Sequence, residues 1–456
     1  MAKKKKKKDD KDIKLKAKVK KLRAKIKALK SDLSTAMPTQ VKAKTVSVSP
    51  LAPAHFPKLP AIAGVEFASA AAGVKYAGRT DVMLARIAPG ASIAGVFTTS
   101  STRAACVLDC QSKLAMRVPK DAGAAIIVNS GNANAFTGKN GQKAVDMVTG
   151  AVAKALDLPV SRVFSSSTGG VGELPFERIV LAVDGLAQRL SGAGIEDAAR
   201  AIMTTDTYPK GASAVIEGEG GPITIAGIAK GSGMIAPNMA TMLVYIFTDA
   251  AITPARLQKM LSRQVDDTFN AITVDSDTST SDALIVAATG QSKAAEIRDL
   301  RTQVAKNFEA GLRDVMMDLA HQVVRDGEGA TKFVEVRVTR AASAEDAHKV
   351  AMAVANSPLV KTATAGEDAN WGRVVAAVGK SGAKADRDKL TISFGDMVLA
   401  EKGWRAPSYS EADASAYMKG DELVIGVDLG LGRANKSVWT CDLTHRYIDI
   451  NADYRS

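Results

Sequence analysis

A glycine-rich loop that runs directly into an apolar strand is the feature that most constrains this chain. Residues 230–241 read Lys-Gly-Ser-Gly-Met-Ile-Ala-Pro-Asn-Met-Ala-Thr, and the apolar run Met242–Phe247 follows at once. Glycines permit positive φ and close backbone approach, and Pro237 fixes one φ. The run has the length of a strand and is rich in β-forming residues. The sequence therefore predicts that Thr241 lies where a loop becomes a buried strand, a position that holds a small nucleophile rigidly.

Thr241 in this position indicates a particular chemistry. A threonine hydroxyl is activated when the α-amino group of the same residue serves as its base, and such an amine titrates near neutral pH. Because Thr241 lies in mid-sequence, this requires cleavage of the Ala240–Thr241 bond. The hydroxyl would attack the Ala240 carbonyl, the acyl group would move from N to O, and water would release a new N-terminus. The alternative is an ordinary Gly/Pro loop that enters a strand without chemistry.

Composition is that of an ordinary globular protein with an unusual N-terminus. The 456 residues are 46% hydrophobic and 24% charged, and no apolar run approaches the ~20 residues that span a bilayer. The net charge of +13 resides entirely in residues 1–30, so the body is neutral and its composition gives no argument for nucleic-acid binding. No secretory signal is apparent, and three cysteines without metal-site spacing suit a reducing cytosol. We therefore expect a cytoplasmic protein.

The chain divides into a basic extension and an α/β body. Residues 1–58 are expected to form the lysine-rich extension and a Pro-containing linker, with an apolar stripe from Leu15 to Leu33 at helical spacing. A solvated extension, contact with a polyanion or a membrane surface, and a short coiled coil all remain open for it. Strands are expected at Ala124–Val128, Met242–Phe247 and Ala283–Ala288. Helices are expected at 142–156, 175–190, 254–268 and along the stripe Val304, Phe308, Leu312, Val315, Leu319 and Val323. This alternation indicates an α/β architecture.

Other common functional motifs are not supported. The glycines at 218–221 and 430–432 lack the spacing of a dinucleotide fingerprint and are interpreted as turns. Aspartates 275, 277 and 282 lack EF-hand spacing and are expected to be hydrogen-bonded turn carboxylates. The four histidines have no HExxH spacing, His321 is expected to be structural, and Cys106 and Cys110 are expected to be buried thiols. No metal site is predicted.

Eight ordered motifs together resemble the glutamate (ornithine) N-acetyltransferase family. The loop at 230–243 is similar to the family's self-cleavage motif K-G-x-G-M-I-x-P-x-x-A-T-M-L. The other similar segments are 128–135, 166–172, 203–207, 273–280, 325–332, 365–373 and 451–456, in family order. The resemblance spans about residues 50 to 456 and does not include the lysine-rich tail. It implies an αββα-sandwich core with a second, smaller α/β domain.

The resemblance also implies roles for individual residues. Cleavage between Ala240 and Thr241 would give an α chain (59–240) and a β chain (241–456) that begins with the nucleophile. The hydroxyl of Thr168 and the backbone N–H of Gly169 would form the oxyanion hole. Substrate contacts would come from Thr207, Lys230, Thr241, Glu328, Asn451 and Ser456. Lys230 is the natural partner of a carboxylate and Glu328 of an ammonium group, while the choice of Thr207 over Thr204 or Thr205 stays open.

The implied activity is acetyl transfer in arginine biosynthesis. The enzyme would move acetyl from N2-acetyl-L-ornithine to L-glutamate through acetyl-Thr241, and it would assemble as an α2β2 heterotetramer. No cofactor is expected. Acetyl-CoA serves some family members as co-substrate, and the sequence leaves that second activity open. The alternatives are a Thr-nucleophile amidohydrolase, a secondary-metabolism acetyltransferase on the same scaffold, and a degenerate scaffold that binds polyanions through its lysine-rich tail. The sequence does not identify the partner of the tail.

Overall fold

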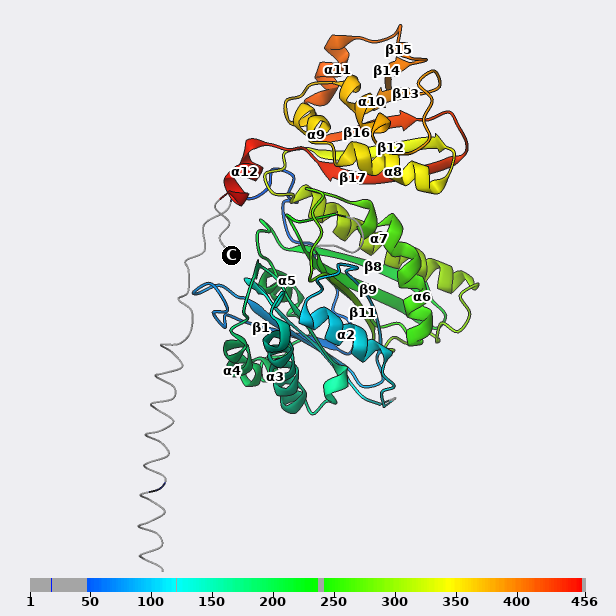
Figure 1. Cartoon of the computed structure of the whole chain (residues 1–456). Helices are drawn as coiled ribbons and strands as arrows, with labels where there is room; N and C mark the ends of the chain where they lie inside the picture. The colour runs from blue at the N-terminus through cyan, green and yellow to red at the C-terminus, as the bar shows by residue number, and fades with distance from the viewer. Residues whose placement is uncertain (1–17, 19–46, 120, 237–241, 453–456) are drawn as a thin grey trace, which may run out of the picture. The chain divides into compact units, whose positions relative to one another are not determined.

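The computed structural model describes residue 18 and residues 47–119, 121–236 and 242–452 (Figure 1). The chain divides into two compact units, Met1–Val41 and Lys42–Ser456. The apolar stripe predicted for the tail therefore lies outside the described residues, and the predicted boundaries at 58 and 240 stay predictions. No helix in the described part of the chain is both long enough and apolar enough to cross a bilayer.

Two sheets packed face to face form the centre of the second unit. The first sheet has the order β1-β2-β4-β6, formed by Val65–Ala70, Val82–Ile87, Ala124–Asn129 and Val163–Ser167. The second has the order β3-β11-β10-β9-β8, formed by Ser92–Phe97, Ala283–Ala288, Leu243–Thr248, Gly221–Lys230 and Lys210–Gly218. One hydrophobic cluster joins their inner faces and includes Phe67 and Ile126 of the first sheet with Tyr245 and Phe247 of the second. Phe67 and Phe247 meet edge to face at 5.0 Å.

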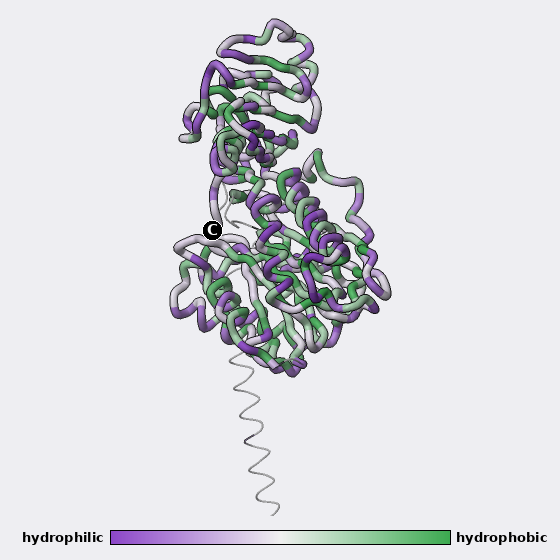
Figure 2. The backbone as a smooth tube through the Cα atoms, turned by 90° about the vertical axis from the view of Figure 1, so that its right-hand side faces the viewer, coloured by the Kyte–Doolittle hydropathy of each residue, from purple (hydrophilic) through white to green (hydrophobic). Residues whose placement is uncertain are grey.

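Helices cover both outer faces of this pair of sheets. Helices α3 (Gly138–Leu156) and α4 (Phe176–Ala187) bury apolar residues against the first sheet. Helices α6 (Pro254–Gln264) and α7 (Gln303–Arg325) do so against the second. In Figure 2 hydrophobic and hydrophilic residues alternate along the helical turns, as expected when one side of each helix is buried. The layers are therefore helix, sheet, sheet and helix, and the predicted αββα architecture is confirmed.

Two further helices cover the open edges of the sandwich. Helix α2 (Ala105–Ala115) contacts β6 and β3, and α5 (Ile195–Ala201) contacts β1, β8 and β9. The short parallel pair β5 (Asn132–Ala133) and β7 (Gly170–Val171) joins the loops that follow β4 and β6. Short 3-10 turns occupy Val160–Arg162, Val265–Asp267 and Phe269–Ala271.

The C-terminal part of the chain forms the smaller α/β domain. Its sheet has the order β15-β14-β13-β16-β12-β17, formed by Trp404–Arg405, Met397–Glu401, Thr391–Phe394, Glu422–Asp428, Phe333–Ala341 and Ala434–Cys441. A separate hydrophobic cluster packs the sheet against its helices. The helices are α8 (Ala344–Ala355), α9 (Pro358–Ala365), α10 (Trp371–Gly379) and α11 (Glu411–Met418), and α12 (His445–Asn451) follows the last strand.

Most expected elements occur close to their predicted bounds. Strand β11 has the predicted bounds, and β10 begins and ends one residue later than predicted. The expected helix at 254–268 ends as α6 at Gln264 and continues as a 3-10 turn. The predicted turns at 218–221 and 430–432 are confirmed, the first as the β8–β9 hairpin with Gly220 at φ 91° and the second with Gly430 at φ 63°.

The predicted thiols and structural histidine are also found. Cys106, Cys110 and Cys441 are free and buried. The His321 ring lies on α7 with its centre 4.6 Å from that of Trp439 and 5.2 Å from that of Phe333. Burial, with the nearby charge of Arg325, holds the pKa of His321 at about 4. His321 is therefore a neutral core residue, as predicted.

A segment before the first strand packs onto the body. Ser49 donates from its backbone to the Thr207 hydroxyl (2.9 Å) and from its hydroxyl to the Arg325 carbonyl (2.6 Å). Leu51 packs on the cluster beneath α7, and Phe56 on the cluster between the sheets. Residues 47–58, predicted to be the end of a linker, thus cross the body close to the predicted site.

Candidate active site

The predicted cleavage loop leaves β9 and returns to β10 on neighbouring strands. Lys230, the last residue of β9, is paired across the antiparallel ladder with Leu243, the first residue of β10. The loop therefore starts and ends at the same end of the sheet. Ala240 and Thr241 lie outside the described residues, so the cleavage and the nucleophile stay predictions.

The first half of the loop is held by hydrogen bonds to distant segments. The Gly231 N–H donates to Asp206 Oδ1 (2.6 Å), and the Ser232 hydroxyl donates to the Asp326 carbonyl (2.6 Å). The Glu328 N–H in turn donates to the Ser232 carbonyl (3.2 Å). The segment before β8 and the turn after α7 thus fix the loop as it leaves Lys230.

Asp275 holds the next residues of the loop. Its carboxylate accepts the N–H groups of Met234 (2.6 Å) and Ile235 (2.9 Å), and the Tyr447 hydroxyl donates to it at 3.1 Å. Met234 adopts φ 57°, a left-handed conformation that costs free energy for a side chain of this size. The prediction that Asp275 is a hydrogen-bonded turn carboxylate is confirmed. These hydrogen bonds hold the loop at Met234 and Ile235.

Lys230 is a buried ammonium group. The residue is 4% exposed, and burial lowers its pKa while the charge of Asp206 raises it. The charges of Asp282 and Glu328 also favour the charged form of Lys230, and the charge of Lys210 opposes it. A buried cation of this kind is suited to bind a carboxylate, because the pairing offsets the loss of its water.

Glu328 is the buried anion of the site. Burial raises the pKa of Glu328, against hydrogen bonds from the side chains of Asn451 and Thr205. The Asn451 amide donates to Glu328 Oε2 at 2.7 Å. A Cβ placed on Gly233 would lie 2.4 Å from the Glu328 carboxyl carbon, so the loop passes directly over this group. The structure therefore brings together Glu328, Asn451 and the loop. Ser456, the other C-terminal residue predicted to contact substrate, lies outside the described residues.

Thr207 occupies a different environment from Glu328. Its hydroxyl donates to Asp326 Oδ1, its N–H donates to Asp326 Oδ2 (2.9 Å), and it accepts the Ser49 N–H. Of the three threonines that the sequence left open, Thr205 is the one that bonds to Glu328. A substrate contact from Thr207 stays a prediction.

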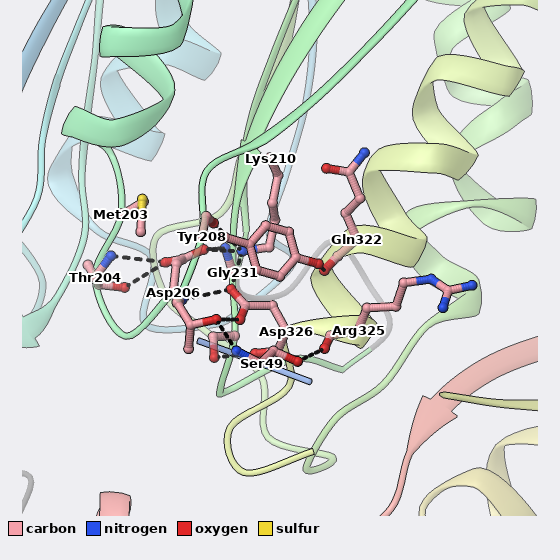
Figure 3. A network of polar contacts seen from close by, with 12 residues as sticks. Ser49, Met203, Thr204, Asp206, Tyr208, Lys210, Gly231, Gln322, Arg325 and Asp326 are labelled. Carbon is pink, nitrogen blue, oxygen red and sulfur yellow. Dashed lines mark hydrogen bonds and ion pairs between the residues drawn. The ribbon is translucent and has the colours of Figure 1, made fainter. Parts of the chain in front are cut away.

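A buried network that the sequence did not predict lies next to the loop (Figure 3). Lys210 Nζ is 2.7 Å from Asp206 Oδ1 and 2.5 Å from Asp326 Oδ2, and all three side chains are fully buried. Burial raises the pKa of Asp206, but the charges of Lys210 and Lys230 outweigh it and hold the pKa well below its usual range. Burial raises the pKa of Asp326 against the opposing charge of Lys210. Asp206 and Asp326 each lie in one of the predicted motifs, so the sequence did point to these two carboxylates. Lys210, which contacts both, lies outside every motif, and nothing in the sequence indicated its role.

The predicted oxyanion residues follow β6. Strands β4 and β6 are parallel, so the loops after them leave the same edge of the sheet. The Thr168 N–H donates to the Asn129 carbonyl (3.1 Å), and both Thr168 and Gly169 are half-buried. Gly169 has φ 123°, and a Cβ there would lie 2.4 Å from the Gly131 carbonyl carbon. The turn packs closely against Gly131 and needs glycine, which is compatible with an oxyanion hole, and the role itself stays a prediction.

The fold and the site together define a class of protein. An αββα sandwich places a buried lysine and a buried glutamate at a loop between two strands, and groups of this kind serve an enzyme that handles a small charged molecule. Residues 66–456 match the ArgJ family. The chain belongs to the ArgJ family, whose members act in arginine biosynthesis.

Relatives of known name support this assignment over nearly the whole chain. An arginine biosynthesis bifunctional protein ArgJ from Ruegeria pomeroyi is 63% identical over 415 residues, which are 91% of this chain and 100% of that protein. The protein of the same name from Brucella suis is 52% identical over 416 residues, which are 90% of this chain and 100% of that protein.

Solved structures of similar sequence cover parts of the chain. The ArgJ structure from Bacillus halodurans is 42% identical, covers 46% of this chain and 98% of its own, and has a TM-score of 0.45. The ornithine acetyltransferase from Mycobacterium tuberculosis, solved with ornithine, is 33% identical, covers 39% of this chain and 93% of its own, and has a TM-score of 0.33.

Proposed function

We propose that this chain transfers acetyl from N2-acetyl-L-ornithine to L-glutamate, giving L-ornithine and N-acetyl-L-glutamate. The chain first cleaves itself between Ala240 and Thr241. The Thr241 hydroxyl then accepts the acetyl group and passes it to the amine of glutamate. The names of the relatives, all arginine biosynthesis bifunctional proteins, support this activity.

Two acyl transfers through the same hydroxyl account for the chemistry. In maturation the Thr241 oxygen attacks the Ala240 carbonyl, the C–N bond breaks, and water hydrolyses the resulting ester to leave a free α-amine. In turnover that amine takes the hydroxyl proton while the oxygen attacks the acetyl carbonyl of acetylornithine. The Thr168 hydroxyl and the Gly169 N–H stabilise the oxyanion. Ornithine leaves with a proton, and glutamate attacks acetyl-Thr241 by the reverse sequence.

The presence of a buried lysine, Lys230, and a buried glutamate, Glu328, beside the same loop is the observation that carries this proposal. Acetylornithine has one carboxylate and one side-chain ammonium group, and glutamate has two carboxylates. Lys230 binds a carboxylate, and Glu328, oriented by Asn451 at 2.7 Å, binds an ammonium group. Both lie beside the loop that leads to Thr241, with Lys230 opposite Leu243 in the sheet.

The remaining properties follow from the same assignment. The two cleavage products associate as an α2β2 heterotetramer. The enzyme works in the cytoplasm, a reducing compartment that suits its three free cysteines. It needs no cofactor, and acetyl-CoA is a candidate co-substrate for direct acetylation of glutamate.

Mass analysis under denaturing conditions tests the maturation step. We expect the parent protein to give two chains that meet at Ala240–Thr241, and Thr241→Ala to give one. Thr253→Ala, at the N-cap of α6, is the matched control and should be cleaved like the parent. An intact, fully active parent chain would overturn the proposal.

A competition assay tests the transfer step. Purified enzyme is given acetylornithine with and without glutamate, and N-acetylglutamate and free acetate are measured. We expect N-acetylglutamate to be the main product. Acetate as the main product would favour the amidohydrolase, and transfer to other amines in preference to glutamate would favour a secondary-metabolism acetyltransferase.

Deletion of residues 1–40 tests the degenerate scaffold that binds polyanions through its tail. Activity that disappears in the deleted protein would favour the tail as the functional part.

A further inference from the structure

The segment before β8, the turn after α7 and the start of the predicted cleavage loop meet at one buried carboxylate. Asp206 Oδ1 accepts the Gly231 N–H (2.6 Å) and Lys210 Nζ (2.7 Å), and Asp206 Oδ2 accepts the Thr204 N–H (2.9 Å). Gly231 directly follows Lys230. We propose that Asp206 is a positioning residue that fixes Lys230 and the loop after it by holding the Gly231 amide. This inference rests on the proposed function.

The ion pairs and hydrogen bonds of the network support a role in positioning. Lys210 bridges Asp206 and Asp326, and the remaining acceptor sites of the two carboxylates are filled by the backbone N–H groups of Thr204, Thr207 and Gly231 and by the Thr207 hydroxyl. Burial of such groups does little for net stability, because desolvation offsets the attraction. The network does define geometry, since each carboxylate is held from several directions.

The network also connects the loop to Glu328, whose charge is opposite to that of Lys230. The Asp326 carboxylate accepts the N–H and the hydroxyl of Thr207, and the Asp326 backbone carbonyl accepts the Ser232 hydroxyl (2.6 Å). Two residues later Glu328 donates its N–H to the Ser232 carbonyl. Lys230 and Glu328 are therefore held in register through Gly231, Ser232 and the two aspartates. Figure 3 shows Asp206, Gly231, Lys210 and Asp326 gathered at this point.

Asp206→Asn is the direct test. The amide is isosteric and leaves Lys210 paired with Asp326, so the fold is expected to persist. Its oxygen still accepts the Gly231 N–H and Lys210, but without the charge of the carboxylate, and its NH2 group faces the Thr204 N–H that Asp206 accepts. The hydrogen bond that holds the Gly231 amide is therefore weakened. Because Lys230 binds the substrate carboxylate in the ground state and in the transition state alike, KM for glutamate should rise on the order of tenfold while kcat changes little. The rate of self-cleavage, measured by pulse-chase labelling in cell-free translation, should fall on the order of tenfold.

Asp249→Asn is the matched control. Asp249 is also buried and accepts one backbone N–H, from Thr224 at 2.7 Å, but it lies at the opposite end of β9 and β10. The control should keep the parental KM and cleavage rate. A merely structural role for Asp206 would lower the active fraction, and so kcat, without moving KM. A parental KM and a parental cleavage rate in Asp206→Asn would overturn the inference.

A second variant keeps the proposal testable if Asp206→Asn does not fold. Asp206→Glu retains a charge for Lys210 but displaces the oxygens from the Gly231 amide, so the same rise in KM is expected. A parental KM in this variant would also overturn the inference. Failure of the parent itself to cleave or to transfer acetyl would instead refute the proposed function, so the two failures are distinguishable.

Discussion

Substituting alanine for Gly169 tests the predicted oxyanion hole. A Cβ at this position would lie 2.4 Å from the Gly131 carbonyl carbon, 2.6 Å from its oxygen and 2.8 Å from the Asn132 nitrogen. All three atoms belong to the backbone, so rotation of a side chain cannot relieve the contact. At φ 123° an alanine would also adopt a conformation that L-residues rarely occupy. The turn therefore has to move.

The size of the effect follows from these distances. An ordinary carbon contact is about 3.5 to 4.0 Å, so the turn must shift by about 1 Å. A shift of that size removes the Gly169 N–H from hydrogen-bond distance to the oxyanion, and the loss of one such donor lowers kcat by about 10² to 10³-fold. The strained conformation costs on the order of 1 to 3 kcal/mol of stability. We expect kcat for acetyl transfer to fall by that factor in Gly169→Ala protein.

The assay compares steady-state acetyl transfer with thermal unfolding. Gly150→Ala is the matched control, because Gly150 lies within α3 and its added Cβ would meet no atom within 4 Å apart from its chain neighbours and the backbone of its own helix. The control should keep full activity and gain about 0.5 to 1 kcal/mol of stability. Parental kcat in correctly folded Gly169→Ala protein would refute the argument that this turn supplies the oxyanion donor.

Two further predictions concern charged and titratable groups. In Glu328→Gln, KM for acetylornithine should rise on the order of thirtyfold, from the loss of roughly 2 kcal/mol of charge-assisted hydrogen bonding. Glu335→Gln, in the smaller domain, should leave KM unchanged, and an unchanged KM in Glu328→Gln would contradict the assigned contact. His321 has a folded-state pKa of about 4, below its unfolded value of about 6.5, so the unfolded state binds more protons between these pH values. The contribution of His321 to stability should therefore be fully present above about pH 7 and fall by about 3 kcal/mol as pH drops to 4, as measured by denaturant unfolding, and the fall should shrink in His321→Gln.

Local sequence patterns predicted most of the sandwich. The apolar stripe of α7 follows helical spacing, and Phe308, Leu312, Val315 and Leu319 are all buried. Continuous apolar runs predicted the central strands, because strands covered on both faces have no polar side. These signals depend only on neighbours in the chain, which is why they could be read without knowledge of the fold.

The contacts that define the site depend on residues far apart in the chain. Lys210 begins β8 and looks like an ordinary surface lysine in the sequence, yet it is completely buried between Asp206 and Asp326. The choice between Thr205 and Thr207 likewise depends on which hydroxyl faces Glu328 after α7 has packed on the sheet. Motif spacing placed both candidates within two residues of each other, but only the tertiary fold separates their environments.

The strand order of the second sheet has a consequence for a protein cut before Thr241. Strands β3, β8 and β9 would come from one fragment and β10 and β11 from the other, in the order β3-β11-β10-β9-β8. The second fragment's two strands would thus be enclosed on both sides by the first fragment. A break there would open a gap in the covalent chain without dividing the sheet, and neither fragment could leave without exposing an unpaired strand edge along its whole length.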